Sequence, residues 1–149
     1  TENIPYIVGL GCACELAAKH MKEEMGRVGA LRDRLEAELL KACPDATING
    51  DTQHRLPNTS NIGFQNIEGE SIFLMMDDFG IAASSGSACT SGSLEPSHVL
   101  RAMGIPFTCV HGSIRFSLSR YNTDADVDHV LAHVPQIIER LTAISPLCG

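Results

Sequence analysis

Residues 112–119 have the sequence GSIRFSLS, in which polar and apolar side chains alternate. In an extended chain Ile114, Phe116 and Leu118 point to one side, while the serines and Arg115 point to the other. This alternation is typical of a strand that packs one face on a hydrophobic core and keeps the other face polar. The stretch therefore predicts a small sheet that helices cover on one face.

The rest of the chain predicts more strands and helices around this one. Apolar and β-branched runs bounded by turn residues predict three further strands, over 46–48, 58–64 and 81–84. Apolar residues at spacings of three and four predict three shorter helices, over 70–79, 96–103 and 123–141. Gly80 and Gly104 stand just past the first two of these helices, and Thr123 with Asp126 forms a capping box at the start of the third.

Residues 5–43 predict one long amphipathic helix, which Pro44 ends. Its apolar residues again fall at spacings of three and four: Ile7, Leu10, Cys14, Ala17, Met21, Met25, Val28, Leu31, Leu35 and Leu39. Gly26 and Gly29 weaken the middle of the helix, so we expect a bend there. A helix of this length in so short a chain is expected to connect two bodies, and to pack against the closing helix.

Composition excludes several classes of protein. The chain has 149 residues, enough for one domain with its own core, and 44% hydrophobic with 19% charged residues is ordinary for a globular protein. A net charge of −7 argues against binding to nucleic acid or to anionic membranes. The six cysteines form no CxxC pair, which argues against a zinc ribbon and favours a reduced, cytoplasmic environment. His129 and His133 have metal-ligand spacing, but no third ligand accompanies them, so we expect no metal site there.

Residues 84–96, SSGSACTSGSLEP, are almost without apolar content and predict a surface loop that presents Cys89. An exposed thiol in such a loop has two explanations. It is either an unreactive cysteine in a linker or a nucleophile kept for its sulfur chemistry. Composition alone leaves both explanations open.

Four stretches resemble, in the same order, motifs of one family. They are TENIPYIVGLG (1–11), LPNTSNIGF (56–64), SSGSACTSGSLEPSHVLRAMG (84–104) and HGSIRFSLSRYNT (111–123). The resemblance is to the cysteine desulfurases, most closely the nitrogen-fixation type, within the class-V aminotransferases of pyridoxal-phosphate fold type I. It implies an α/β C-terminal small domain, with a connector helix over 1–43 and the small sheet and cysteine loop over 44–149. We then expect a large cofactor-binding domain outside this chain.

The resemblance also implies roles for three residues. Cys89 would be the catalytic nucleophile and would take sulfur from the substrate as a persulfide. Through this persulfide it would supply sulfur for an iron–sulfur cluster. The resemblance implies no resident metal site. Arg115 would hold the substrate carboxylate, although an exposed strand arginine is the simpler alternative. Thr1 would reach the cofactor phosphate of the partner subunit in a homodimer, although in this chain it is expected to be a helix cap or a frayed terminus.

By the same resemblance the cofactor is pyridoxal 5′-phosphate and the substrate is L-cysteine. The sulfur acceptor is an iron–sulfur scaffold serving nitrogenase maturation. The chain has only three lysines, Lys19, Lys22 and Lys41, and none stands in the Ser-x-His-Lys setting that the family uses for its Schiff base. We therefore expect this chain alone neither to bind the cofactor covalently nor to desulfurate cysteine. Two alternatives stay open, a sulfur-accepting or partner-docking module and a selenocysteine lyase, whereas Cys89 argues against an ordinary aminotransferase.

Overall fold

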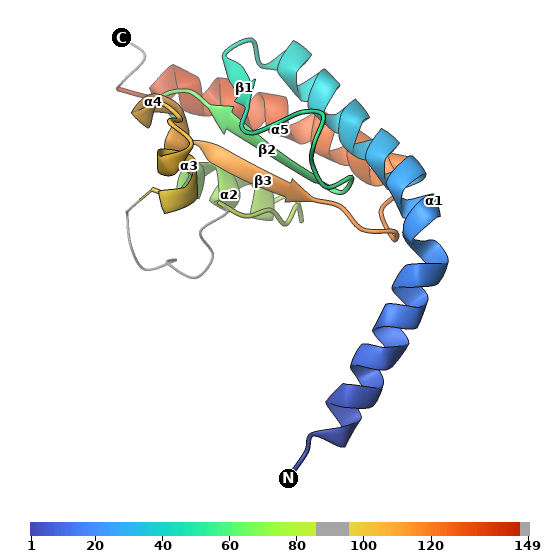
Figure 1. The fold of residues 1–149 in the computed structure, drawn as a ribbon. Coiled ribbons are helices and arrows are strands. Elements are labelled where there is room, and N and C mark those ends of the chain that lie inside the picture. The colour runs from blue at the N-terminus through green and yellow to red at the C-terminus, as the bar shows by residue number, and fades with distance from the viewer. Residues whose placement is uncertain (86–95, 147–149) are drawn as a thin grey trace.

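The computed structural model describes residues 1–85 and 96–146 and contains a three-stranded antiparallel sheet (Figure 1). Its strands, in the order β1-β2-β3, are β1 (Ala46–Ile48), β2 (Thr59–Phe64) and β3 (Ser113–Ser117). In the central strand, Ile62 pairs with Ile48 on one side and with Ile114 on the other. These pairings confirm the strands predicted over 46–48, 58–64 and 112–119.

Five helices accompany the sheet within the described residues: α1 (Ile4–Ala42), α2 (Gly69–Asp77), α3 (His98–Ala102), α4 (Phe107–Val110) and α5 (Asp124–Ile144). As predicted, α1 and α5 pack together, and α2 also packs against α5 (Figure 1). The capping box of α5 is confirmed: the Thr123 hydroxyl accepts from the Asp126 N–H, and the Asp126 carboxylate accepts from the Thr123 N–H at 2.8 Å. The short helix α4 was not predicted.

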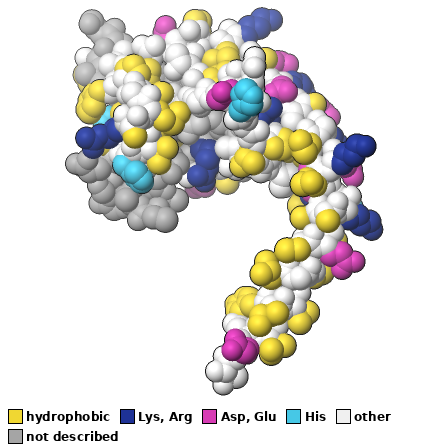
Figure 2. Space-filling view, in the orientation of Figure 1, with side chains coloured by type: hydrophobic (Ala, Val, Ile, Leu, Met, Phe, Trp, Pro, Cys, Tyr) yellow, Lys and Arg dark blue, Asp and Glu magenta, His cyan; other side chains and the backbone are white. Residues whose placement is uncertain are grey.

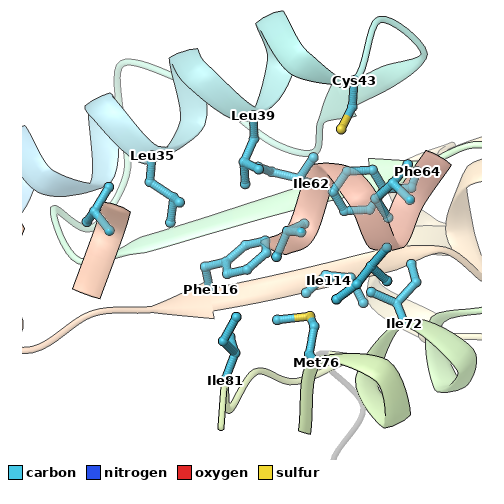
Figure 3. Packing of buried hydrophobic residues seen from close by; sticks show 14 of the residues in the cluster. Leu35, Leu39, Cys43, Ile62, Phe64, Ile72, Met76, Ile81, Ile114 and Phe116 are labelled. Atoms are coloured by element: carbon cyan, nitrogen blue, oxygen red, sulfur yellow. The ribbon is translucent and has the colours of Figure 1, made fainter. Parts of the chain in front are cut away.

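The hydrophobic core lies on one face of the sheet (Figure 3). The sheet contributes Ile62, Phe64, Ile114 and Phe116, which are all at most 5% exposed. Side chains of α1, α2 and α5 pack against this face, among them Leu35, Leu39, Ile72, Met76, Val134 and Ile137. The alternation over 112–119 thus confirms the predicted one-sided sheet. Ile137 of α5 is 2% exposed and belongs to the same core.

The two halves of α1 have different surroundings. Val28 and Leu39 are 1% and 0% exposed, whereas Ile7 and Leu10 are 56% and 67% exposed. Figure 1 shows the N-terminal part of α1 projecting from the rest of the molecule, with a change of direction partway along the helix that agrees with the predicted bend. Figure 2 shows hydrophobic side chains along this projecting part. Of the ten residues in the predicted apolar stripe, only the last four, from Val28 to Leu39, are therefore buried within this chain.

The strand predicted over 81–84 is not formed. Ser84 makes an isolated antiparallel bridge with Arg115, and residues 81–83 join no strand. Ile81 instead uses its side chain in the core, where it is 8% exposed, and its N–H donates to the Met76 carbonyl at the end of α2. The segment is therefore tied to α2 at its start and to β3 at its end.

Gly112 occupies a position at which no side chain fits. A Cβ atom there would lie 2.1 Å from the Phe64 carbonyl oxygen and 2.7 Å from that of Ile67. We expect Gly112→Ala to lower the free energy of unfolding by about 3 kcal/mol, because both obstacles are backbone atoms and the end of β2 would have to move. Urea unfolding followed by circular dichroism measures this change.

Gly9→Ala is the matched control, because a Cβ at Gly9 meets nothing within 4 Å and alanine suits a helix. This control should not lower the free energy of unfolding. Equal unfolding midpoints for Gly112→Ala and the unmodified chain would contradict the close packing at Gly112.

Candidate functional site

The face of the sheet opposite the core is polar, and we call it the polar sheet face. It is formed by alternate residues of β2 and β3: Thr59, Asn61, Gly63, Ser113, Arg115 and Ser117. Helix α4 closes one end, since a Cβ at Gly63 would meet Cys109 of α4 at 3.4 Å and the Ser113 hydroxyl donates to the Cys109 carbonyl at 2.8 Å. Towards the other end Arg115 is half-buried and Ser117 is exposed.

Arg115 lies on this face as predicted, directly across from Asn61. Its Nε atom is buried and has no hydrogen-bond partner among the described residues. None of the acidic side chains that the structure describes forms an ion pair with it, whereas Arg34 and Arg55 both pair with carboxylates. A guanidinium stays charged at any working pH, so Arg115 is a half-buried cation on a polar face, suited to bind an anion.

The backbone ties Arg115 to the segment that leads to the cysteine loop. The Arg115 N–H donates to the Ser84 carbonyl at 2.6 Å, and the Ser84 N–H donates to the Arg115 carbonyl at 3.2 Å. Cys89 follows Ser84 by five residues in the sequence and lies outside the described residues. The described chain therefore approaches the loop from beside Arg115.

A hydrogen-bonded chain of side chains lies next to Arg115 and was missed by the sequence analysis. The Asn49 amide donates to the Asn61 Oδ1 atom at 2.7 Å and to the Ser113 hydroxyl oxygen at 2.9 Å. Ser113 is 1% exposed. The local sequence around Asn49 predicts only a turn. Its hydrogen bonds to Asn61 and Ser113 could not be predicted, because they depend on how β1 pairs with β2 and β2 with β3.

Thr1 is not brought to this face. It is exposed and precedes Asn3, whose side chain caps α1 by accepting from the Tyr6 N–H. Figure 1 places the N-terminus at the far end of the projecting part of α1, away from the sheet. The phosphate role expected for Thr1 stays a prediction.

The residues present do not fit a covalent pyridoxal-phosphate site. Lys19, Lys22 and Lys41 are the only lysines, and all three are exposed on α1 rather than on the polar sheet face. None of the three lysines is therefore placed to form a Schiff base at the polar sheet face.

The remaining candidate groups do not form a second site. Cys43 and Cys109 are buried, and burial raises the pKa of the Cys43 thiol, which makes it a poor nucleophile. The His133 ring contacts the rings of Phe79 and His129, at 4.3 and 4.4 Å between ring centroids and with the planes tilted by 38° and 50°. No group of three metal-ligating side chains occurs in the described parts of the chain. Within residues 1–85 and 96–146, no helix is long and apolar enough to span a membrane.

Comparison with known proteins identifies the family. The model for the aminotransferase class-V family matches residues 1–130, and the chain belongs to this family. It is 64% identical over 146 residues to a protein of Gluconacetobacter diazotrophicus named cysteine desulfurase, covering 98% of this chain and 36% of that protein. It is 57% identical, with the same coverage, to the cysteine desulfurase NifS of Azotobacter vinelandii.

Solved structures agree with this assignment. A NifS-like protein superimposes with a TM-score of 0.81 at 33% identity, covering 95% of this chain and 35% of that chain. The NifS-like protein of Rickettsia africae gives 0.80 at 30% identity, covering 93% of this chain and 36% of that chain. The expected fold is thereby confirmed, and the chain spans about a third of the length of the relatives that it matches.

Proposed function

We propose that this chain is part of a cysteine desulfurase and that Arg115, on its polar sheet face, binds the carboxylate of L-cysteine. The observation that carries the proposal is Arg115, a half-buried cation without an acidic partner among the described residues, tied by its backbone to the segment that leads to Cys89. The names of the relatives support the reaction.

In this proposal Arg115 fixes the substrate by a bidentate contact to its carboxylate. Cys89, as a thiolate, attacks the sulfur of the substrate. A sulfur–sulfur bond forms and the carbon–sulfur bond breaks. The electron pair stays on the carbon, which takes up a proton, so that alanine leaves and Cys89 carries a persulfide.

The proposal extends to the parts that this chain does not contain. We propose pyridoxal 5′-phosphate as the cofactor, attached through residues outside this chain, with Thr1 reaching the phosphate across a homodimer interface. Residues 1–43 would connect the cofactor-binding part to the small domain over 44–149. An iron–sulfur scaffold in the cytoplasm, one that serves nitrogenase maturation, would accept the sulfur from Cys89.

The experiment uses a chimera in which this chain replaces the matching segment of the Gluconacetobacter diazotrophicus relative. The chimera should release alanine from L-cysteine. In it, Arg115→Ala should raise the KM for L-cysteine about a hundredfold, because two charge-assisted hydrogen bonds are lost. Arg115→Lys keeps the charge but not the bidentate geometry, so its KM should lie between that of the unmodified chimera and that of Arg115→Ala.

Arg120→Ala is the matched control, since Arg120 follows β3 and its guanidinium contacts only the Tyr121 hydroxyl and ring among the described side chains. Its KM should not change. An active chimera whose KM is indifferent to Arg115→Ala would refute the carboxylate role. A chimera that makes no alanine, yet accepts persulfide sulfur on Cys89 from a donor, would favour the sulfur-accepting module instead.

A further inference from the structure

We propose that Asn61 is a second binding residue for the substrate carboxylate, and that Asn49 and Ser113 orient it for this task. The inference deepens the proposed function, since it concerns the same carboxylate that Arg115 would bind. It rests on the register of β2 and β3 and on the direction of the hydrogen bonds in the chain that joins Asn49, Asn61 and Ser113.

The direction of these hydrogen bonds is fixed from one end. The Cys109 carbonyl can only accept, so the Ser113 hydroxyl donates to it at 2.8 Å. The Ser113 oxygen is then free to accept from the Asn49 amide nitrogen at 2.9 Å. The second hydrogen of the same nitrogen goes to the Asn61 Oδ1 atom at 2.7 Å. Asn61 therefore has its oxygen engaged and its NH2 group available.

Asn61 carries this NH2 group at the position directly opposite Arg115. Asn61 and Arg115 are direct cross-strand partners, so their side chains leave the same face with Cβ atoms about 5 Å apart. Both are half-buried, and none of the described groups accepts a hydrogen bond from the Arg115 Nε atom. An amide NH2 and a guanidinium whose Nε atom has no acceptor among the described residues thus extend from directly opposed positions on one face, and both groups can only donate.

Carboxylate chemistry fits this pair of donors. A carboxylate offers about four acceptor positions, and a bidentate arginine occupies two of them. A neutral amide beside the arginine fills a third without adding charge. A phosphate dianion would be expected to draw a second cation, and none of the described residues of this face other than Arg115 is basic.

Binding by the chimera tests the inference without depending on turnover. Calorimetry compares L-alanine, which has the carboxylate, with L-alaninamide, which lacks it. Asn61→Ala should weaken L-alanine binding about tenfold and leave L-alaninamide binding unchanged. Asn61→Asp should weaken L-alanine binding further, because the new carboxylate would pair with Arg115 and compete with the ligand.

Thr59→Ala is the matched control on the same strand and face, since the Thr59 hydroxyl bonds only to the neighbouring Asn58 side chain among the described residues. It should alter neither affinity. The relevant chimera is one whose L-alanine affinity depends on Arg115. In it, the inference would be overturned if Asn61→Ala weakened the binding of L-alanine and of L-alaninamide equally, or weakened the binding of neither. A chimera that makes no alanine from L-cysteine, but whose L-alanine affinity depends on Asn61 as expected, would refute the proposed reaction. It would still support carboxylate binding by Asn61 and Arg115.

Discussion

Cys89→Ser in the chimera should lower alanine formation from L-cysteine by about a thousandfold or more. A serine hydroxyl is not ionised near neutral pH and cannot form a persulfide, so sulfur would have no acceptor on the protein. Intact-mass measurement after incubation with L-cysteine should show one added sulfur atom on the unmodified chimera and none on the variant. The affinity for L-alanine should not change, because Arg115 would still hold the carboxylate.

Cys12→Ser is the matched control for this experiment, because Cys12 is an exposed free thiol on the projecting part of α1. It should keep both the alanine formation and the added sulfur. Persulfide that still accumulates in Cys89→Ser at the rate of the unmodified chimera would assign the nucleophile to another cysteine.

The second large effect concerns stability and arises at Glu36, in the buried half of α1. Its carboxylate accepts hydrogen bonds from both terminal nitrogens of Arg55, at 2.7 and 2.8 Å, and from the Ser60 hydroxyl at 2.6 Å. Glu36 is 6% exposed and Ser60 is 1% exposed. This carboxylate thus joins α1 to the loop before β2 and to β2 itself.

Glu36→Ala should lower the free energy of unfolding by about 3 kcal/mol, because it leaves Arg55 without its main partner and the buried Ser60 hydroxyl without an acceptor. Urea unfolding measures the loss. Glu38→Ala is the matched control two residues further along the same helix, where the carboxylate is 55% exposed and lies 3.5 Å from Arg34. It should cost less than about 1 kcal/mol. Similar losses in the two variants would contradict a special role for the Glu36 contacts.

The same site predicts a dependence on pH. Burial acts to raise the pKa of Glu36, but hydrogen bonds from Arg55 and Ser60 and the charges of Arg55 and Arg32 outweigh it, so the pKa lies below its ordinary value of 4.5. A carboxylate with a lowered pKa stabilises the folded state above its unfolded-state pKa and loses this contribution as the pH falls through the folded-state value. Glu36→Gln should therefore lose less stability than the unmodified chain on acidification below about pH 4.5. Parallel pH profiles would show that Glu36 does not titrate as argued.

Much of the fold follows from local patterns, and what does not depends on pairing between distant segments. Alternation over 112–119 identified β3, its apolar face and the place of Arg115 on the other face. It could not show that Asn61 stands opposite Arg115, because strand register is a long-range property. Nor could any local pattern join Glu36 to Arg55 and Ser60, which are 19 and 24 residues away.

The apolar stripe of α1 shows a different limit of such reasoning. Its spacing of three and four residues continues from Ile7 to Leu39, yet burial begins only near Val28. Periodicity reports which side of a helix is apolar and not whether something covers it. The isolated bridge at Ser84 is a similar case, because residues 81–84 have strand-like composition but only the last of them pairs.

The uneven burial of α1 also bears on cooperativity. Its last turns share the core with the sheet and with α5, so they can unfold only when the domain does. Its first turns are exposed and project from the rest of the molecule (Figure 1), so their order in this chain depends mainly on the helix–coil equilibrium of that segment. One continuous helix of 39 residues therefore contains two thermodynamic units, and a stability measured for one of them says little about the other.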